Sequence, residues 1–286
     1  MTETRTQRGG FRGDEHREGS EPDADDRRPQ LAETFERSVT EGRHRLGRTW
    51  PQLLATGTVG GMDVTLGVLA LLVVEHETGS PLLGALAFSI GFIALTLANS
   101  ELFTENFLVP VAAVAARRAT VGALLRLWAG TAVTNLVGGY VLIGLVMAGL
   151  PELGPTAVKI ARHYIELRPW PALAAGVVGG VVITLMTWME HGSEEMVGKL
   201  AAAVSAAFLL VAGTLNHTVV VSILAFAALH AGAPFGYLHW LRTLGLATAG
   251  NAIGGLGLVT TLRLVQTGPQ RRRHAEQRGQ TQDGRR

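Results

Sequence analysis

The stretches ELFTEN at 101–106 and LNHT at 215–218 decide how this chain folds, because each places polar side chains inside a long apolar segment. Each lies about 30 residues before an Asn-x-x-Gly-Gly unit, NLVGG at 135–139 and NAIGG at 251–255. Hydrocarbon penalises polar side chains and unpaired backbone groups. Two matched interruptions of this kind in a membrane protein predict a site that binds or moves something polar.

The composition predicts an all-α membrane protein. Of 286 residues, 47% are hydrophobic and 17% are charged, and the charge is crowded into the first 48 and the last 18 residues. Between Pro51 and Gln266 the apolar runs are long enough to cross about 30 Å of hydrocarbon. The chain has no cysteine, which excludes disulfides and thiolate metal sites. Its Arg-rich tails are typical of membrane-flanking segments, so we do not expect nucleic acid as a partner.

We expect six membrane-spanning helices, of which the second and the fifth are unusually long. As continuous helices of 35 and 33 residues they would measure about 50 Å, too long for one crossing and too short for two. Each is therefore predicted to be broken, with a non-helical piece at membrane depth covered by protein or a water-filled cavity. The expected spans are 52–74, 81–115, 121–149, 171–189, 198–230 and 240–266.

The chain divides into three parts. Residues 1–48 are predicted to run from disordered to amphipathic, because the first 30 residues have little to bury and Leu31, Phe35 and Val39 have helical spacing. A solvated tail is the alternative for this segment. Residues 49–267 are predicted to form a six-span transmembrane domain, with the segment 150–170 joining its halves, and residues 268–286 are predicted to form a basic tail.

The distribution of positive charge predicts the orientation. Of the 25 Lys and Arg, 21 lie on the side that carries both termini. By the positive-inside rule, both termini are expected in the cytoplasm, with the protein in the plasma membrane. The polar start of the chain lacks an apolar signal-peptide region, so the first span is expected to direct insertion. The four cationic residues expected on the other side are Lys159, Arg162, Arg168 and Arg242.

The two halves, about 52–149 and 171–266, have the same order: a whole span, a broken span, and a span with Asn-x-x-Gly-Gly. Since three spans is an odd number, the second copy enters the membrane from the opposite face. This predicts an inverted repeat with a pseudo-two-fold axis in the membrane plane and both interruptions near the centre.

His217 is the only one of nine histidines deep inside an apolar segment. An imidazole changes its charge near physiological pH, so His217 suits a pore, although a purely structural buried histidine is the alternative. We expect Thr104 to hydrogen-bond it across the pseudo-two-fold axis. Glu101 and Glu105 are interpreted as caps of the half-helices.

Asn106 is expected to support the first break. Asn135 and Asn251 are interpreted as clamps whose amides bond the backbone that the breaks leave unpaired.

Six features of the sequence together resemble the formate/nitrite transporter family over about residues 50–266. They are the stretch FSIG at 88–91, ELFTEN, NLVGG, Trp188-Met189, His217 and NAIGG. The resemblance implies homopentamers of aquaporin-like protomers, each with its own pore for small monovalent anions such as formate, nitrite or hydrosulfide. It implies pore roles for His217 and Thr104, and for Asn216 beside the histidine. The apolar constriction positions that it implies are Phe88, Leu102, Phe103, Ile183 and Leu210.

The chain also departs from the family pattern. Asn216 stands where the family usually has a glutamate, and Val221 stands where it has an asparagine. Tyr164 falls near the place of the family's external lysine, with Lys159 and Arg162 in its neighbourhood. The resemblance is therefore to a divergent subgroup.

A comparison of free-energy costs favours passage of the substrate together with a proton. Moving a bare anion through a dry apolar ring costs on the order of tens of kcal/mol, whereas protonating a carboxylate at pH 7 costs about 4 kcal/mol. We therefore expect a small weak-acid anion and protons as the partners within membrane lipid. No cofactor, metal or enzymatic activity is expected.

Three alternatives remain at this point. A channel for a neutral solute such as water or glycerol shares the inverted three-span repeat, but Asn-Pro-Ala signatures are missing. An intramembrane metallohydrolase using His217, His230 and His239 lacks a His-Glu-x-x-His motif. A membrane protein without transport activity is the third, because the departures beside His217 leave it open.

Overall fold

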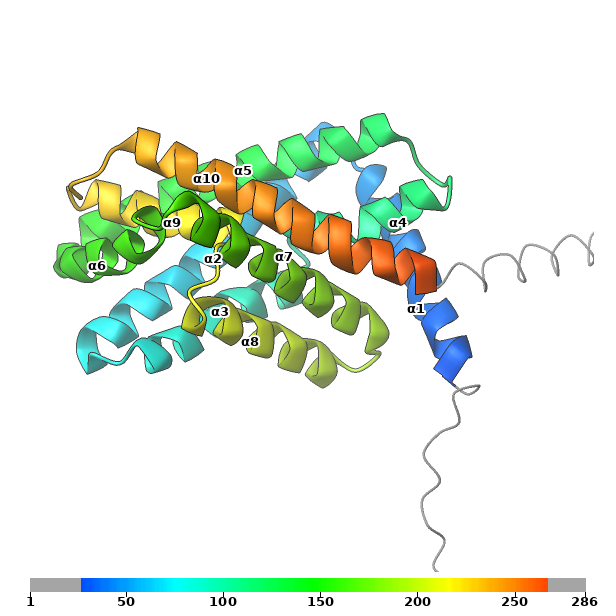
Figure 1. The fold of residues 1–286 in the computed structure, drawn as a ribbon, viewed down its shortest axis with the longest axis horizontal. Coiled ribbons are helices and arrows are strands. Elements are labelled where there is room, and N and C mark those ends of the chain that lie inside the picture. The colour runs from blue at the N-terminus through cyan, green and yellow to red at the C-terminus, as the bar shows by residue number, and fades with distance from the viewer. Residues whose placement is uncertain (1–26, 267–286) are drawn as a thin grey trace, which may run out of the picture.

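The computed structural model describes residues 27–266, and this part of the chain consists of helices joined by turns. Within residues 27–266, five helices are long and apolar enough to cross a membrane. They run side by side along the long axis of the molecule (Figure 1). These helices are α2 (Trp50–Thr78), α3 (Pro81–Ala98), α5 (Val121–Gly149), α7 (Pro169–Gly192) and Tyr237–Gln266, which comprises α10 (Tyr237–Ala252) and the π-helical η3 (Ile253–Thr260).

The second and the fifth predicted spans are both interrupted, as the sequence predicts. In the second span, α3 is followed by a non-helical turn, the short 3-10 helix η1 (Thr104–Phe107) and α4 (Val109–Ala115). In the fifth, α8 (Met196–Ala212) and α9 (Thr218–His230) are separated by residues 213–217. The predicted all-α fold with two broken spans is therefore confirmed.

Both breaks begin in the same way. Asn99 follows α3 with a φ of 51°, and Thr214 follows α8 with a φ of 50°. This left-handed conformation ends a helix by turning the chain away from the helix axis. Asn99 and Thr214 occupy the same place in the two copies, two residues before Glu101 and Asn216 respectively.

The helix contacts repeat between the halves. In the first copy α2 packs against α3 and α5, and in the second copy α7 packs against α8 and α10. The copies are joined by contacts of α3 with α8 and of α5 with α9. One cluster of buried side chains includes residues of both copies, such as Phe88, Ile143, Ile183 and Leu210. The two halves therefore share a single core.

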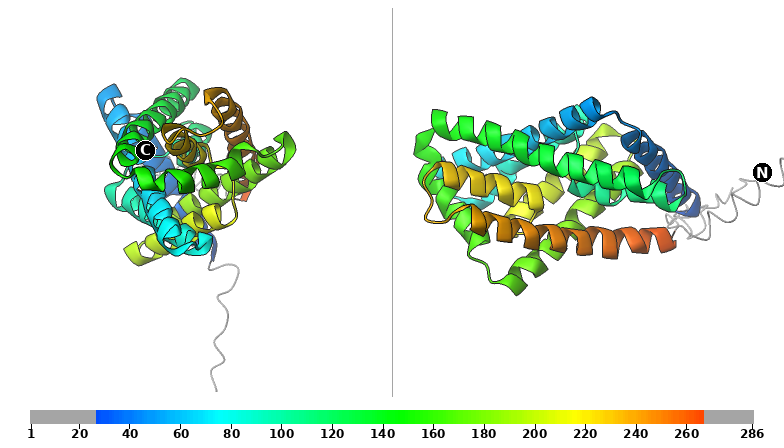
Figure 2. Two further views of the ribbon diagram at one scale, coloured as in Figure 1. Left: turned by 90° about the vertical axis from the view of Figure 1, so that its left-hand side faces the viewer. Right: turned by 90° about the horizontal axis from the view of Figure 1, so that it is seen from above.

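Two helices lie outside the bundle of spans. At one end of the molecule, α1 (Arg27–Leu46) lies beside the end of the last helix, and we call this the α1 end (Figures 1 and 2). At the opposite end, the α6 end, a 3-10 turn (η2, Pro151–Leu153) leads into α6 (Gly154–Ile165). Helix α6 packs against α9.

Helix α6 was not predicted, because the segment 150–170 was treated only as a connection. Its buried residues Ala157, Ile160, Ala161 and Tyr164 recur at helical spacing, which makes one face apolar. The helix α1 agrees in position with the expected amphipathic helix, with Phe35 and Val39 buried. Leu31 lies where side chains are outside the described part of the structure.

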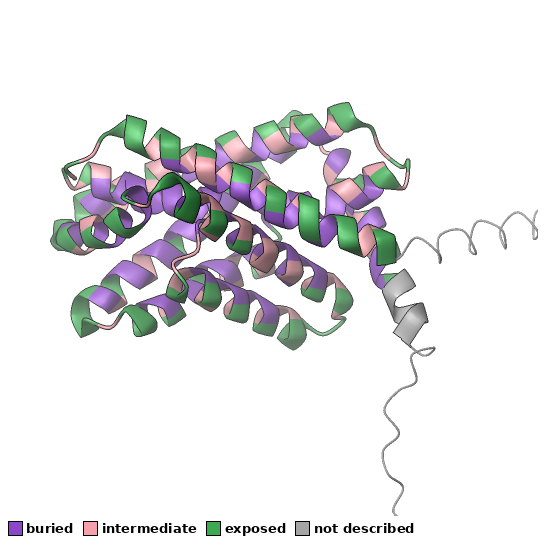
Figure 3. Ribbon diagram, viewed as in Figure 1, coloured by how far each residue is buried: buried purple, intermediate pink, exposed green. Residues whose placement is uncertain are grey.

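The outer surface of the spans is apolar. Exposed residues alternate with buried ones along the helices, so that each span has an inner and an outer face (Figure 3). Many of the exposed side chains are large and hydrophobic, among them Val133, Leu145, Leu241 and Leu262. Such a surface suits lipid or a neighbouring subunit and not water.

Candidate functional site

The first break is clamped by Asn135 of α5. Its Nδ2 atom donates to the carbonyl oxygens of Gly57 at 2.7 Å and Glu101 at 2.8 Å. Its Oδ1 atom accepts a hydrogen bond from the backbone nitrogen of Phe103 at 2.9 Å. The amide thus satisfies backbone groups on both sides of Leu102 that a continuous helix would have paired internally.

Asn251 of α10 makes the same three bonds to the second break. Its Nδ2 atom donates to the carbonyl oxygens of Gly176 and Asn216, each at 2.8 Å. Its Oδ1 atom accepts from the backbone nitrogen of Thr218 at 2.9 Å. The interpretation of both asparagines as clamps agrees with these hydrogen bonds.

Glycines let the whole spans approach the breaks. A Cβ atom on Gly60 of α2 would lie 2.3 Å from the carbonyl oxygen of Glu101. A Cβ atom on Gly179 of α7 would lie 2.7 Å from the carbonyl oxygen of Asn216. Only glycine fits at these positions, and the pairing of Gly60 with Gly179 fixes the alignment of the two copies.

The breaks bring Thr104 and His217 together. Thr104 begins η1 and His217 caps α9, and both side chains are buried. The Oγ1 atom of Thr104 lies 2.6 Å from Nε2 of His217, which is the hydrogen bond that the sequence analysis expects. The backbone nitrogen of Val220 donates to Nδ1 of His217 at 3.4 Å. Because Nδ1 accepts, a neutral ring carries its proton on Nε2 and donates it to Thr104.

The neighbouring Asn216 is directed elsewhere. Its Nδ2 atom donates to the carbonyl oxygen of Ala172 at 3.0 Å, which ties the second break to the start of α7. Its buried Oδ1 atom has no hydrogen-bond partner within the described residues. Asn216 therefore supports the backbone beside His217 and makes no hydrogen bond to the imidazole.

The expected constriction residues are all buried, but they do not form one group. Phe88, Leu102, Ile183 and Leu210 belong to the shared core cluster. Phe103 packs edge-on against Phe107, with ring centroids 5.0 Å apart. Leu102 and His217 are equivalent in the two copies, because each is bracketed by a clamping asparagine. The centre is thus apolar on one side and polar on the other.

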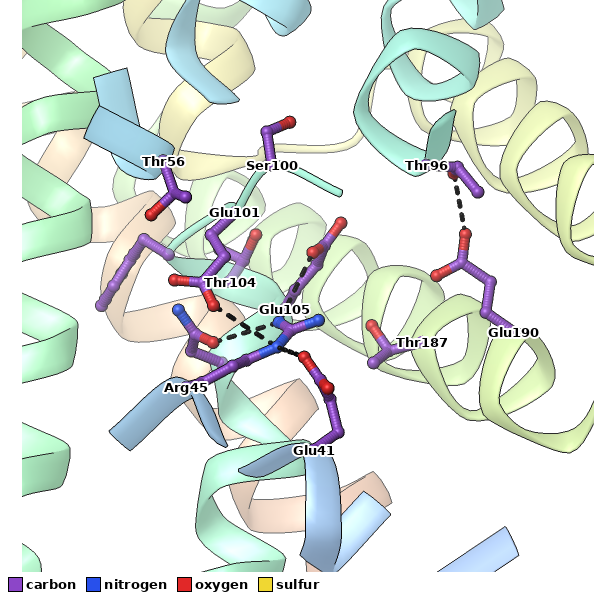
Figure 4. A network of polar contacts seen from close by, with 12 residues as sticks. Glu41, Arg45, Thr56, Thr96, Ser100, Glu101, Thr104, Glu105, Thr187 and Glu190 are labelled. Carbon is purple, nitrogen blue, oxygen red and sulfur yellow. Dashed lines mark hydrogen bonds and ion pairs between the residues drawn. The ribbon is translucent and has the colours of Figure 1, made fainter. Parts of the chain in front are cut away.

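Glu101 supports the first break through ion pairs and not as a helix cap, because α3 already ends at Ala98. Its Oε1 atom lies 2.6 Å from Nη1 of Arg48 and 3.4 Å from Nε of Arg45. Arg45 also pairs with Glu41 at 3.0 Å and with Glu105 at 3.9 Å (Figure 4). Two arginines from the segment before the first span therefore neutralise a buried carboxylate at the break.

Sequence reasoning missed these ion pairs, because Arg45 and Arg48 served only to predict the orientation. The available signal was Glu101, since a carboxylate within a membrane domain needs a cationic partner. Burial opposes the charged form of Arg45, but Glu101, Glu105 and Glu41 outweigh it and raise the pKa of Arg45 above its ordinary value.

Asn106 links the same region to α5. Its Oδ1 atom accepts from Nη1 of Arg45 at 3.3 Å, and its carbonyl oxygen accepts from Nε1 of Trp128 at 2.9 Å. The carbonyl oxygen of Phe107 accepts from the hydroxyl of Thr260 at 2.8 Å, within the π-helical η3. Trp128 of α5 and Thr260 of η3 thus both hold η1 through its carbonyl oxygens.

A cavity of about 790 Å³ lies between α1, the end of α3 and the end of α7. We call it the α1-side cavity. Its wall includes more carboxyl groups than basic groups, and the basic residues are Arg37, Arg45, Lys199 and His191. Ser100 and Glu105 line it next to the first break, and Glu190 accepts a hydrogen bond from Thr96 at 3.0 Å (Figure 4). The carboxylates in its wall are those of Glu33, Glu36, Glu41, Glu105, Glu190 and Glu194.

At the α6 end, the charges near the expected lysine position are already paired. Lys159 lies 3.1 Å from the buried carboxylate of Glu75, and Arg162 lies 2.6 Å from Glu166. Tyr164 is buried, and burial, followed by the charge of Glu75, raises the pKa of Tyr164 above its ordinary value. Tyr164 therefore stays neutral and supplies no positive charge.

The three histidines of the metallohydrolase alternative are not brought together. The ring of His230 packs against Tyr140, with ring centroids 4.9 Å apart, and Nδ1 of His239 accepts from the backbone nitrogen of Gly236 at 3.4 Å. Among residues 27–266, no cluster of three or more potential metal ligands is found.

Comparison with known proteins assigns this architecture to a family. Residues 32–265 match the family described as formate/nitrite transporter. The chain belongs to the formate/nitrite transporter family. The resemblance seen in the sequence is thereby confirmed, and the chain is an integral membrane protein of a family of channels and transporters.

Relatives within the formate/nitrite transporter family cover most of the chain. The uncharacterized transporter YrhG of Bacillus subtilis is 26% identical over 244 residues, which cover 82% of this chain and 91% of YrhG. The formate channel BtFdhC of Bacillus thuringiensis is 27% identical over 248 residues, covering 80% of this chain and 91% of BtFdhC.

A solved structure described as a pentameric formate channel with formate bound has the same fold. Its TM-score is 0.64 at 20% identity, over 76% of this chain and 96% of that chain.

Proposed function

We propose that the chain transports small monovalent weak-acid anions of the formate and nitrite type, together with a proton, through one pore in each protomer. The observation that carries this proposal is the hydrogen bond between Thr104 and His217 at the meeting point of the two breaks. Family membership and the naming of BtFdhC as a formate channel support the substrate class.

The hydrogen bonds around His217 determine how a substrate is held. The backbone of Val220 donates to the imidazole and the imidazole donates to Thr104, so the Thr104 hydroxyl is free to donate its own proton. No other hydrogen bond of this hydroxyl is found within residues 27–266. A carboxylate or nitrite oxygen at this point accepts the hydroxyl proton and is polarised toward protonation.

The surroundings favour a neutral species on either side of this point. Leu102 and Ile183 are buried in the shared core, and a bare anion among such groups costs on the order of tens of kcal/mol. The α1-side cavity has six carboxylates against Arg37, Arg45 and Lys199 in its wall. An excess of carboxyl groups disfavours anions and concentrates protons, which favours passage between this cavity and the centre as the neutral acid.

The assembly and orientation complete the proposal. The apolar outer faces of the spans suit a homopentamer embedded in lipid, and the similar formate channel is described as pentameric. The excess of Lys and Arg on the sequence segments expected to share a side with both termini supports cytoplasmic termini in a plasma-membrane protein. Membership of a family of channels and transporters supports transport as the activity of the chain.

Stopped-flow measurements on proteoliposomes test the function. Formate, nitrite and acetate should enter faster as the pH falls, whereas chloride should be slow at every pH because it cannot be protonated. Thr104→Val should slow formate entry, and Thr104→Ser, which retains the hydroxyl, should preserve it. Chloride as fast as formate would contradict proton-linked passage, and entry of glycerol without formate would indicate a channel for neutral solutes.

A further inference from the structure

Asp63 is a further ionisable group at membrane depth, and it has no part in the proposed pore. It lies near the middle of α2, 13 residues after Trp50 and 15 before Thr78. Only 7% of the residue is exposed. Burying an ionisable residue inside a span costs free energy, so we expect Asp63 to have a polar partner and a functional role.

The hydroxyl of Ser100 provides the partner. Ser100 lies in the first break, one residue before Glu101, and its Oγ atom donates a hydrogen bond to Oδ2 of Asp63. Ser100 is itself buried and is part of the wall of the α1-side cavity. The carboxyl group of Asp63 is therefore connected to this cavity through one hydroxyl group.

No charged group compensates Asp63 within the described residues. Helix α3, which packs against α2, has no ionisable residue, and α9 has only His230 at its far end. In α5, Arg126 bonds the carbonyl oxygens of Leu46 and Arg48, and Tyr140 pairs with Tyr237. In α6, Lys159 pairs with Glu75, Arg162 pairs with Glu166, and His163 bonds the carbonyl oxygen of Lys159.

The remaining charges near Ser100 belong to the cavity and the break. Glu101 is paired with Arg48 and Arg45, and Glu105 and Glu190 face the cavity with Arg45. The two carboxyl groups thus differ in kind. Glu101 is held by two guanidinium groups, whereas Asp63 has a hydroxyl group alone and is free to gain or lose a proton.

The inverted repeat shows that the fold does not require this pair. Asp63 lies three residues after Gly60, and the equivalent residue after Gly179 is Val182. Ser100 precedes Glu101, and the equivalent residue before Asn216 is Leu215. Both Val182 and Leu215 pack against the shared core. Both members of the pair are thus replaced by aliphatic residues in the other copy, where the same backbone is built without them.

We propose that Asp63, acting through Ser100, exchanges the proton of the transported acid at the cavity end of the pathway. A neutral acid in the α1-side cavity gives its proton to Oγ of Ser100 while the hydroxyl proton of Ser100 passes to Oδ2 of Asp63. The products are the free anion and a protonated Asp63, which releases the proton to cavity water. Transport in the other direction reverses each transfer.

This inference rests on the proposed weak-acid transport, and the test separates the two. Exchange of labelled formate is measured in proteoliposomes with equal pH on both sides. At neutral pH, Asp63→Asn should be slower than the native chain by about a hundredfold, the low end for loss of a positioned proton-transfer group. Near pH 4, where formic acid itself is abundant, the variant should approach the native rate.

The control is Thr65→Val, which removes a buried hydroxyl two residues away that bonds only the carbonyl oxygen of Gly61 on the same helix. It should exchange formate like the native chain at both pH values. If Asp63→Asn matches the native chain at neutral pH, or is equally slow at every pH, the proposal is overturned, since the carboxyl group is then dispensable or merely structural.

An infrared titration of the reconstituted protein tests proton exchange at Asp63 without substrate. It remains informative if Asp63→Asn fails to assemble. Ser100→Ala keeps the carboxyl group and removes its hydrogen bond. A pH-sensitive carboxyl band should move to higher frequency in this variant, and no movement of any such band overturns the proposal. If the native chain moves no weak acid at all, the proposed function fails, while this titration still reports whether Asp63 exchanges its proton.

Discussion

Leu102 and His217 occupy equivalent positions in the two halves of the molecule. Asn135 bonds the carbonyl group before Leu102 and the amide group after it, and Asn251 does the same around His217. One backbone design is therefore used twice, once around an aliphatic side chain and once around an imidazole.

The two clamps should contribute equally to stability. Asn135→Ala and Asn251→Ala each leave backbone groups unpaired at membrane depth, and each should destabilise the protein by about 3 kcal/mol, at about 1–3 kcal/mol for each orphaned group. Thermal unfolding in detergent measures the effect. Asn99→Gly is the matched control, because Gly adopts the same left-handed conformation without strain. Unequal losses for the two clamps would contradict their equivalence.

In both copies, the unbroken span should tolerate no side chain larger than glycine where it contacts the break. Gly60→Ala and Gly179→Ala place a Cβ atom within 2.3 Å and 2.7 Å of a carbonyl oxygen, so both should lower the yield of folded protein sharply. In Gly122→Ala the new methyl group meets no atom within 4 Å, so this variant should fold normally. Size-exclusion chromatography of the three variants provides the comparison. Normal assembly of Gly60→Ala or Gly179→Ala would show that the spans do not approach as described.

The ion pair between Arg48 and Glu101 should be essential only while the carboxylate is present. Arg48→Ala leaves a carboxylate that is fully buried and should destabilise the protein by about 3 kcal/mol. The double variant Arg48→Leu/Glu101→Leu should be less harmful than Arg48→Ala alone. Arg162→Ala, which breaks an exposed pair with Glu166, should cost less than about 0.5 kcal/mol. A double variant worse than Arg48→Ala would argue against charge compensation as the role of Arg48.

The attachment of α1 should weaken in acid. Burial opposes the charge of Glu41, but Arg45 outweighs it and holds the pKa of this carboxyl below its ordinary value of 4.5. A depressed folded-state pKa gives stability that is present above about pH 4.5 and is lost as the pH falls through the folded value. Hydrogen exchange of residues 33–46, corrected for its intrinsic pH dependence, should show stable protection from pH 8 to pH 5 and a fall below that range.

Glu41→Gln is the control for this pH effect. It removes the titrating group, so protection of α1 should be lower at neutral pH and should vary less with acid than in the native chain. An unchanged acid-dependent fall in Glu41→Gln would assign the effect to another carboxylate.

Much of the site follows from sequence because it depends on local signals. The spacing from each break to its Asn-x-x-Gly-Gly unit predicts the clamps, and the odd number of spans brings Thr104 to His217. The ion pairs of Glu101 join residues more than 50 positions apart, and no local pattern specifies them. Helix α6 was missed because a 12-residue amphipathic stretch between prolines is typical of a connecting segment. Asp63 was detectable in principle, as a single carboxylate in an apolar span.

The π-helical end of the last span is another feature that the sequence does not specify. A continuous helix was expected through 240–266, whereas Ile253–Thr260 is π-helical. An added residue in a helical turn is rare and occurs often at functional sites. Here the last π-helical residue, Thr260, donates its hydroxyl to the carbonyl oxygen of Phe107 in the first break.

The pH profile of formate uptake by His217→Phe tests the central claim most directly. In the proposed function, the buried Thr104–His217 pair polarises the substrate toward protonation. Native uptake in proteoliposomes should therefore depend steeply on pH. The Phe variant should be slower and should lose that dependence, while assembling like the native protein. Uptake with an unchanged rate and an unchanged pH profile would show that the imidazole has no part in transport.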